Sequence, residues 1–487
     1  MYIGIDLGTS GVKTLLMSGE GAVIRTVTKH YEVDMPQSGW TQQDPMMWLN
    51  QTIAALAELV KGYEDAIVAC SFSGQMHGMV TLDHNDQVLR PALLWNDQRT
   101  SAQVDALIDY FGLDGNQQLT QNIPLTGLTA PKVLWMKEHE PKLFQRIEKI
   151  MLPKDYLVYC FTGAFVTDVS DVSGTHYYDV KANQYSRPML EFLSINETQL
   201  PRVVESDTLV GTLLPKWATI LGLTQPLHVV VGGGDQAVGA IGVGVVKPGM
   251  ASLSLGTSGV FFVPTTTSAL DTINHLQSYR DASHHFHVMG VLLNAAGVIK
   301  WWVEEVLQSK DYPAFYQSIE AIELESPLFY LPHMSGERFP INDPHASGVF
   351  YGIGHQHQQV HLGRAVVEGV TLSLKEAFEK IKQFQPDITT LRLTGGGARN
   401  DIWAQMIADA LDVTVIKLST EEGPSYGAAM LAFAGHTAKP IADISTGFIQ
   451  LGQTFKPRST SRRYFAARFE KFITLYPKIQ PLHHSLK

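Results

Sequence analysis

Short apolar runs separated by polar turns fill the first 75 residues and predict strands around a single helix. Two strands are expected over Tyr2–Leu7 and Val12–Met17, joined by a tight turn at Gly8–Gly11. A third strand is expected within Ala22–Val33, and a buried strand over Ala66–Phe72.

A helix is predicted between the third and fourth of these strands. Asp44 is a candidate N-cap, and Pro45 suits the first helical position. The apolar side chains that follow recur at near-helical spacing, at Trp48, Ile53, Leu56 and Leu59. The chain therefore begins with three strands, a helix and a further strand.

A similar order restarts near the middle of the chain. The predicted elements are a strand at Val229–Val231, a glycine turn at Gly232–Gly234, a helix over Asp235–Val243, and strands at Ala251–Leu255 and Val260–Val263 on either side of a turn at Gly256–Gly259. A later strand at Leu391–Leu393 leads into three glycines, and a helix over Asp401–Leu411 is expected to bury Ile402, Met406, Ala410 and Leu411.

A short internal repeat links the two halves. The stretch from Asp6 to Gly11 is echoed from Ser254 to Gly259, with Leu-Gly-Thr-Ser-Gly in both copies. Each copy lies between two predicted strands, which makes a chance duplication a poor explanation. The fold class expected is therefore α/β, with two related domains over residues 1–245 and 246–487 that face each other across a cleft.

The repeated turns are candidate phosphate-binding loops. Glycine turns expose backbone N–H groups, small hydroxyl side chains add donors, and such a cluster forms an anion-binding concavity without a lysine. Two copies on opposing domains would hold a polyphosphate from both sides. The loop residues are Gly8, Thr9 and Ser10 in the first copy and Gly256, Thr257 and Ser258 in the second.

The better-known nucleotide motifs do not fit. The chain has no P-loop sequence. Gly395, Gly396 and Gly397 follow a strand and precede a helix, but position 400 is Asn, so the third spaced glycine of a dinucleotide-binding fold is missing. We expect these glycines to let an adenine or ribose approach the backbone closely.

Two carboxylates are candidates for the chemistry. A carboxylate beside a polyphosphate needs a cation between them, so Asp6 is a candidate Mg²⁺ ligand, with a turn-capping role as the alternative. Phosphoryl transfer to a hydroxyl needs a carboxylate that accepts the proton, and we assign this role to Asp235. A structural helix N-cap would explain Asp235 equally well on local grounds.

Bulk composition narrows the function further. The formal charge of the 487 residues is −10, which argues against nucleic acid as a partner. The N-terminus shows no signal-peptide pattern, and the most apolar long window is interrupted by Asp235 and Gln236, so no membrane association is expected. Cys70 is expected to be a buried core residue. These features predict a cytoplasmic protein.

Together these motifs resemble the FGGY family of carbohydrate kinases, which has an actin-like, ribonuclease H-like fold in two domains. The resemblance rests on Ile5–Ser10, Gly233–Asp235, Ser254–Gly259 and Thr394–Arg399. Within the family the chain is most similar to the bacterial xylulokinases, through Ser73–Gly78, Leu94–Arg99, Leu152–Leu157 and Leu331–Arg338. The likeness implies an ATP- and Mg²⁺-dependent kinase that converts D-xylulose to D-xylulose 5-phosphate, with a homodimer as a further expectation.

The resemblance also implies roles for particular residues. Met76 and His77, with Gln75 beside them, would contact the sugar, and Asp235 would take the proton from its 5-hydroxyl. Asp6 would serve the metal, the second loop the γ-phosphate, and Gly395–Gly397 with Asn400 the adenosine. Trp95 is expected to pack in the core or between the domains, with a contact to the sugar left open.

One position departs from the xylulokinase pattern. Gln236 stands after the base where Asn is usual, and as a sugar-contacting amide it could alter the preferred substrate. Two alternatives therefore stay open. One is another kinase of the family, acting on ribulose, gluconate, glycerol or a deoxy sugar, and the other is an ATPase of the actin or chaperone type.

Overall fold

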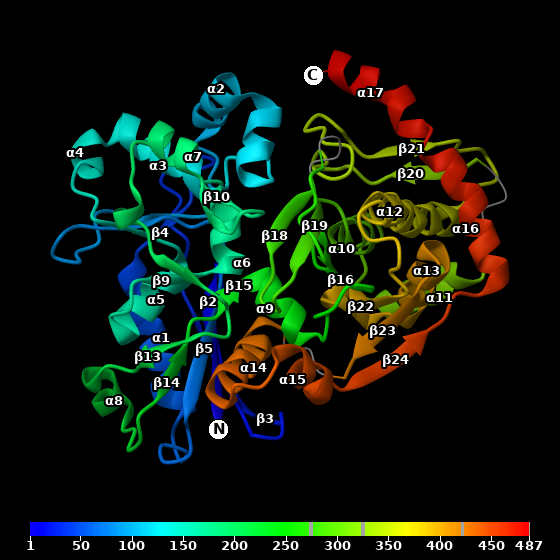
Figure 1. The fold of residues 1–487 in the computed structure, drawn as a ribbon. Helices are drawn as coiled ribbons and strands as arrows, with labels where there is room; N and C mark the ends of the chain where they lie inside the picture. Colours follow the sequence, from blue (N-terminus) through cyan, green and yellow to red (C-terminus); the bar gives the residue numbers. More distant parts are fainter. Residues whose placement is uncertain (272–275, 323–326, 420–422, 487) are drawn as a thin grey trace.

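Two mixed β-sheets lie side by side in the computed structural model, which describes residues 1–271, 276–322, 327–419 and 423–486 (Figure 1). The first sheet has the order β13-β14-β5-β1-β2-β3, with β15 also paired to β5. Its strands are β1 (Tyr2–Leu7), β2 (Gly11–Met17), β3 (Val23–His30), β5 (Ala69–Gly74), β13 (Leu209–Thr212), β14 (His228–Val230) and β15 (Gly233–Gly234). The predicted opening strands are confirmed.

The predicted first helix, α1 (Pro45–Leu59), is also confirmed. Asp44 is its N-cap, and its side chain accepts a hydrogen bond from the backbone N–H of Met46 at 2.9 Å. Trp48, Leu56 and Leu59 are buried against the first sheet. Pattern and capping signals agree here, so the local sequence is enough to define the element.

The second sheet repeats the topology of the first. Its order is β18-β19-β17-β16-β22-β23-β24, formed by β16 (Met250–Leu255), β17 (Gly259–Thr265), β18 (Gln277–Arg280), β19 (Phe286–Leu292), β22 (Thr390–Thr394), β23 (Thr414–Leu418) and β24 (Leu451–Phe455). β16 pairs antiparallel with β17 and parallel with β22, as β1 pairs with β2 and β5. The two repeated loops therefore follow equivalent strands in two ribonuclease H-like domains, as predicted.

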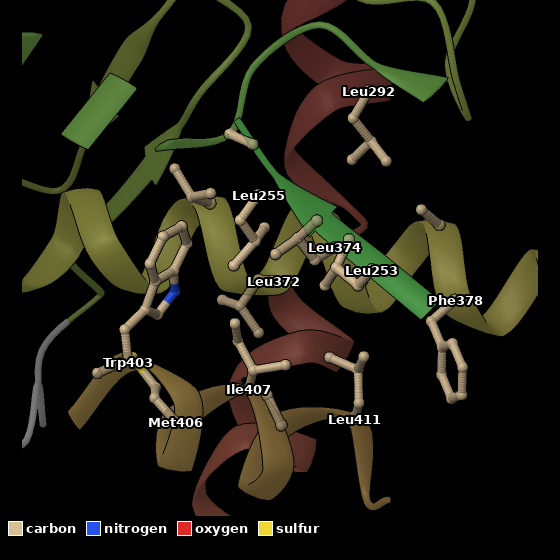
Figure 2. Packing of buried hydrophobic residues seen from close by; sticks show 14 of the residues in the cluster. Leu253, Leu255, Leu292, Leu372, Leu374, Phe378, Trp403, Met406, Ile407 and Leu411 are labelled. Atoms are coloured by element: carbon tan, nitrogen blue, oxygen red, sulfur yellow. The ribbon is translucent and has the colours of Figure 1, made fainter. Parts of the chain in front are cut away.

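The second domain has its own core beneath its sheet. Leu253 and Leu255 of β16 pack over the long helix α12 (Gln359–Ile381), and α13 (Asp401–Leu411) closes the other side (Figure 2). Trp403 and Ile407 of α13 are fully buried, whereas Ile402, which the periodicity predicts to be buried, is partly exposed. The other predicted positions, Met406, Ala410 and Leu411, are buried as expected, and the indole N–H of Trp403 donates to Thr371 Oγ1 of α12 at 3.0 Å.

Two helices whose backbones are in close contact lie between the two sheets. They are α9 (Asp235–Gly242) and α14 (Pro424–Thr437), which lie between the two sheets in Figure 1. A Cβ atom on Gly427 would lie 1.9 Å from the carbonyl oxygen of Val238, and one on Gly242 would lie 2.0 Å from that of Gly423. α14 comes from the second half of the sequence but packs against β1 and β5, so the domain boundary near residue 245 stays a prediction.

The remaining elements of the first domain are helices and short two-stranded sheets. The helices include α2 (Ser101–Thr120), α3 (Thr129–His139), α5 (Pro153–Thr162) and the single turn α6 (Val169–Val172). Cys70 is buried in the core, as predicted. None of the helices in the described part of the chain has both the length and the apolar character needed to cross a bilayer.

Candidate active site

Asp6 lies near the end of the central strand of the first sheet. Ser73 is its register partner on β5 and donates a hydrogen bond from Oγ to Asp6 Oδ1 at 2.9 Å. Burial raises the pKa of Asp6 to about 6, although the hydrogen bond from Ser73 and the charge of Lys13, the register partner of Asp6 on β2, lower it. The side chain is thus held in a protein environment that disfavours its negative charge.

The first of the two predicted phosphate-binding loops, Gly8–Ser10, is held by hydrogen bonds to its threonine. The hydroxyl of Thr9 donates to Gln75 Oε1 at 3.1 Å and accepts from Trp95 Nε1 at 2.9 Å, while Gln43 Nε2 donates to the carbonyl of Thr9 at 2.8 Å. Gln75 is buried, and its Nε2 faces Gln43 Oε1. Gln75 therefore orients the loop, and its contact with the sugar stays a prediction.

Trp95 was expected in the core or between the domains; the core placement is wrong, and an interdomain position or a contact with the sugar stays a prediction. Its side chain is 45% exposed, and its indole N–H is directed at the loop. The residues after it hold it there: Asp97 and Arg99 form a buried ion pair at 2.8 Å, and the Arg99 guanidinium lies 3.9 Å from the centre of the Trp40 ring. No local pattern indicates that an exposed indole would bond to Thr9, because the two residues are 86 positions apart.

Asp235 is the first residue of α9 and projects into the space between the domains. The helix N-cap is Gly234, so Asp235 does not cap the helix and that alternative is excluded. Gly233 and Gly234, predicted as a turn, instead form β15 beside Ser73 and Gly74 of β5. Glycine is required there because a Cβ on Gly233 would lie 2.6 Å from the Oγ of Ser170.

Two carboxylates share this site. Burial raises the pKa of Asp235 to about 7, with a further contribution from the negative charge of Asp6. A carboxylate with a pKa near neutrality can accept a proton from a hydroxyl and release it again at physiological pH. Asp235 thus has a position and a pKa that suit a general base, and its role as the base stays a prediction.

A buried ion cluster lies next to Gly233 and Gly234, which precede Asp235 (the Asp235 loop). The sequence did not predict this cluster. Lys154 Nζ lies 2.6 Å from Asp155 Oδ1, 2.9 Å from Asp168 Oδ1 and 3.7 Å from Asp171 Oδ2, and all four side chains are essentially inaccessible. Ser170 connects this cluster to the loop: its Oγ bonds to Asp168 Oδ2 and accepts a hydrogen bond from the backbone N–H of Gly234 at 3.1 Å.

The charges in this cluster do not cancel. One lysine faces three carboxylates, and burial, followed by the repulsion of Asp155, Asp168 and Asp235, raises the pKa of Asp171 well above its usual range despite Lys154. Neither carboxyl oxygen of Asp171 has a hydrogen-bond partner among the described residues. Burial without a hydrogen-bond partner therefore favours the protonated form of Asp171.

Met76 and His77 lie next to the Asp235 loop. A Cβ on Gly234 would be 2.9 Å from Met76 Sδ, and one on Gly174 would be 2.5 Å from His77 Nδ1. Burial, with the charges of Lys132 and Arg338, lowers the pKa of His77 to about 3, so its ring is neutral. Nδ1 lies 2.8 Å from the carbonyl oxygen of Gly174 and must donate to it, which leaves Nε2 as an acceptor for a hydroxyl group.

Two neighbouring cavities are lined by several of the predicted nucleotide-binding residues, but not by Gly8, Thr9, Ser10 or Ser258. The first, about 390 Å³, is lined by Asp235, Gln236, Gly395 and Gly396 among others, so it has walls from both domains. The second, about 500 Å³, lies within the second domain, where Gly256, Thr257, Gly396, Gly397 and Asn400 meet Ala296, Ile299 and Tyr312. The two cavities share Gly396 and Arg399.

The three consecutive glycines have different roles. Gly395 has φ 83°, and a Cβ on Gly397 would lie 2.6 Å from the Trp403 ring, so both are required by packing. Gly396 has open space in front of it and faces both cavities. Asn400 caps α13 by accepting from the backbone N–H of Trp403 at 3.0 Å while it lines the second cavity.

Comparisons with known proteins agree on the family. The N-terminal domain of the FGGY family of carbohydrate kinases matches residues 1–242, and its C-terminal domain matches residues 251–436. A xylulose kinase from Bacillus subtilis is 37% identical over 491 residues, covering 100% of this chain and 98% of the relative. One from Escherichia coli is 38% identical over 487 residues, covering 99% of this chain and 100% of the relative.

Solved structures give the same result. A crystal structure of a "xyloylose kinase" from Brucella ovis has a TM-score of 0.94 and 33% identity, and covers 99% of each chain. Both domains, the order of the motifs and the full-length relatives therefore agree: this chain belongs to the FGGY family of carbohydrate kinases.

Proposed function

We propose that this kinase transfers the γ-phosphoryl group of ATP to the 5-hydroxyl of D-xylulose, forming D-xylulose 5-phosphate and ADP. The observation that carries the proposal is the carboxylate of Asp235, which projects between the domains with a pKa raised to about 7. The full-length relatives named xylulose kinase support the choice of sugar.

The reaction needs one base and an in-line approach. Asp235 accepts the proton of the 5-hydroxyl as its oxygen bonds to the γ-phosphorus and the bond between that phosphorus and the β,γ-bridging oxygen breaks. ADP leaves with the electron pair of the broken bond, and Asp235 returns the proton to solvent. His77 accepts a hydrogen bond from another sugar hydroxyl at Nε2, and Met76 packs against the carbon chain.

The nucleotide is proposed to bind mainly to the second domain. Adenine fits the apolar part of the 500 Å³ cavity between Ile299, Tyr312 and Gly397, and the triphosphate extends past Thr257 toward the first domain. The loops at Gly8–Ser10 and Gly256–Ser258 then donate hydrogen bonds to its oxygens from opposite sides. Movement of the domains about α9 and α14 would exclude water from the transfer.

The residues present fit a magnesium ion bound with the nucleotide. The carboxylates of Asp6 and Asp235 place two acidic groups near each other, and Mg²⁺ prefers such oxygen ligands together with substrate phosphates. Asp6 would hold it, directly or through water, and the repulsion between Asp6 and Asp235 would be relieved. The ion supplies charge neutralisation for the phosphates.

A panel of sugars tests the proposal. ADP release is measured by a coupled assay with D-xylulose, D-ribulose, gluconate, glycerol and deoxy sugars, and without sugar. We expect the highest kcat/KM with D-xylulose and little ADP release without sugar. Because Gln236 lines the cleft beside Asp235, Gln236→Asn is the matched variant for the amide position. Preference for another sugar would overturn the substrate, and sugar-independent ATP hydrolysis would overturn the kinase reaction. Cytoplasmic location and a homodimer remain predictions.

A further inference from the structure

The second sheet turns one face toward the first domain, and Tyr279 lies on that face. Tyr279 on β18 is the register partner of His287 on β19, so both side chains point the same way. Their ring centres are 5.6 Å apart, and His287 stacks on Phe262 at 4.1 Å. Phe262 lines the cavity that also contains Asp235. Tyr279 therefore belongs to the cleft face and not to the core of its own domain.

The residues before and after Tyr279 on β18 are hydrogen-bonded to the first domain. The side chain of Asn122 donates to the carbonyl of Ser278 and accepts from the N–H of Ser278, both at 2.9 Å. The N–H of Arg280 donates to Ser173 Oγ at 3.1 Å. These bonds fix the backbone on either side of Tyr279, so the position of its ring is well defined.

Tyr279 meets the predicted sugar-binding residues across the domain boundary. Its ring centre is 6.3 Å from that of His77, and the residue is 1% exposed. Its hydroxyl has no hydrogen-bond partner among the described residues. A buried hydroxyl left without a partner costs about 1–3 kcal/mol, and buried tyrosines normally find one. The missing partner points to a polar ligand that joins the site.

The order of residues along the site indicates which part of the ligand this is. Gly234, which directly precedes Asp235, is in contact with Met76. His77 follows Met76 in the sequence, and its ring lies beside that of Tyr279. A sugar whose terminal hydroxyl meets Asp235 would pass Met76 and direct its other end toward Tyr279. In a 2-ketose that end carries the 1-hydroxyl next to the carbonyl.

We propose that Tyr279 is a specificity-determining residue that hydrogen-bonds the 1-hydroxyl of the ketose substrate, so that the second domain takes part in reading the sugar. The inference rests on the proposed function, because it takes the sugar end opposite to Asp235 as its ligand. Burial raises the pKa of the Tyr279 phenol above its usual value, so the group remains a hydrogen-bond donor at any pH at which the enzyme works.

The test compares two sugars in two variants. We measure kcat/KM for D-xylulose and for 1-deoxy-D-xylulose in the wild type, in Tyr279→Phe and in Tyr330→Phe. Tyr330 is an equally buried tyrosine of the second domain that packs against Phe350, away from the cleft. Tyr279→Phe should lower kcat/KM for D-xylulose about fivefold to tenfold, leave the deoxy sugar within about twofold, and leave the KM for ATP unchanged. Tyr330→Phe should change neither sugar.

The outcomes separate this inference from the proposed function. If the wild type phosphorylates D-xylulose and Tyr279→Phe lowers kcat/KM equally for both sugars, or for neither, the inference is overturned while the function stands. A wild type that does not discriminate between the two sugars overturns it as well. If the wild type releases no ADP with D-xylulose, the proposed function fails, and the inference fails with it.

Discussion

The carboxylates of Asp6 and Asp235 are close enough that the charge of Asp6 raises the pKa of Asp235. Asp6 is at the end of β1, and Asp235 is at the start of α9, 229 residues later in the chain. The fold brings them together because β15, which precedes α9, pairs with β5, and β5 pairs with β1. The pair links the predicted metal ligand to the predicted base.

The first prediction is an acidic limb in the pH profile. Asp235 must be ionised to accept a proton, and its pKa is raised to about 7. We expect kcat/KM, measured with both substrates below their KM, to fall about tenfold per pH unit as the pH decreases below about 7. A profile that stays flat down to pH 5 would contradict the assignment of Asp235 as the base.

The second prediction concerns the origin of this pKa. Asp6→Asn removes the neighbouring charge, so the acidic limb should move to lower pH, and the rate should also decrease if Asp6 is the proposed magnesium ligand. The same pH series measures it at raised magnesium concentration. A limb that stays at its original pH would show that burial alone sets the pKa of Asp235.

The third prediction separates catalysis from folding. Asp235→Asn should lower kcat by several orders of magnitude while nucleotide binding, followed by calorimetry, survives. A carboxylate whose pKa is higher in the folded than in the unfolded protein destabilises the fold as the pH rises above the unfolded value. Asp235→Asn should therefore raise the thermal midpoint of the ligand-free protein more at pH 8 than at pH 5. Near-normal turnover would eliminate the base assignment.

The fourth prediction tests the ion cluster beneath the Asp235 loop. Lys154→Met leaves the buried carboxylates of Asp155, Asp168 and Asp171 without their cation, which should cost about 3–5 kcal/mol of unfolding free energy in a urea titration. Adding Asp171→Asn should restore part of the loss, because one unpaired acid is removed.

A surface pair provides the control for this cluster. Lys149 lies 2.8 Å from Asp86, but both side chains reach solvent, so Lys149→Met should cost less than about 1 kcal/mol. Equal losses for Lys154→Met and Lys149→Met would mean that the buried lysine does not hold the cluster together.

Features encoded within a few residues could be predicted from the sequence. The first hairpin, the capped start of α1 and the duplicated loops all depend on local turn and capping chemistry, and the structure shows these elements close to where they were expected. The position of Asp235 could be predicted for the same reason, because glycines and a helix start surround it.

Features that depend on distant pairing could not be predicted. Nothing near Lys154 in the sequence shows that Asp168 and Asp171 will face it, nor that Trp95 will bond to Thr9. In the sequence Tyr279 looks like an ordinary strand residue, and only the packing of the second sheet against the first domain shows that its ring lies beside His77. These contacts arise when separate elements pack, and a single sequence carries no local signal for them.

The last prediction addresses the close backbone contact between α9 and α14. In Gly427→Ala the new methyl group would lie 1.9 Å from the carbonyl oxygen of Val238, so α14 must move away from α9. This should cost at least about 1–3 kcal/mol and lower kcat, because α9 carries Asp235. Gly447→Ala is the matched control: Gly447 is in the helix α15 (Ile441–Phe448), and its Cβ would meet nothing within 4 Å, so stability should be unchanged or slightly higher. Thermal unfolding and kcat, measured on both variants, decide the matter. If Gly427→Ala matches Gly447→Ala in both, the two helices do not need their backbone contact for the base to be held in place.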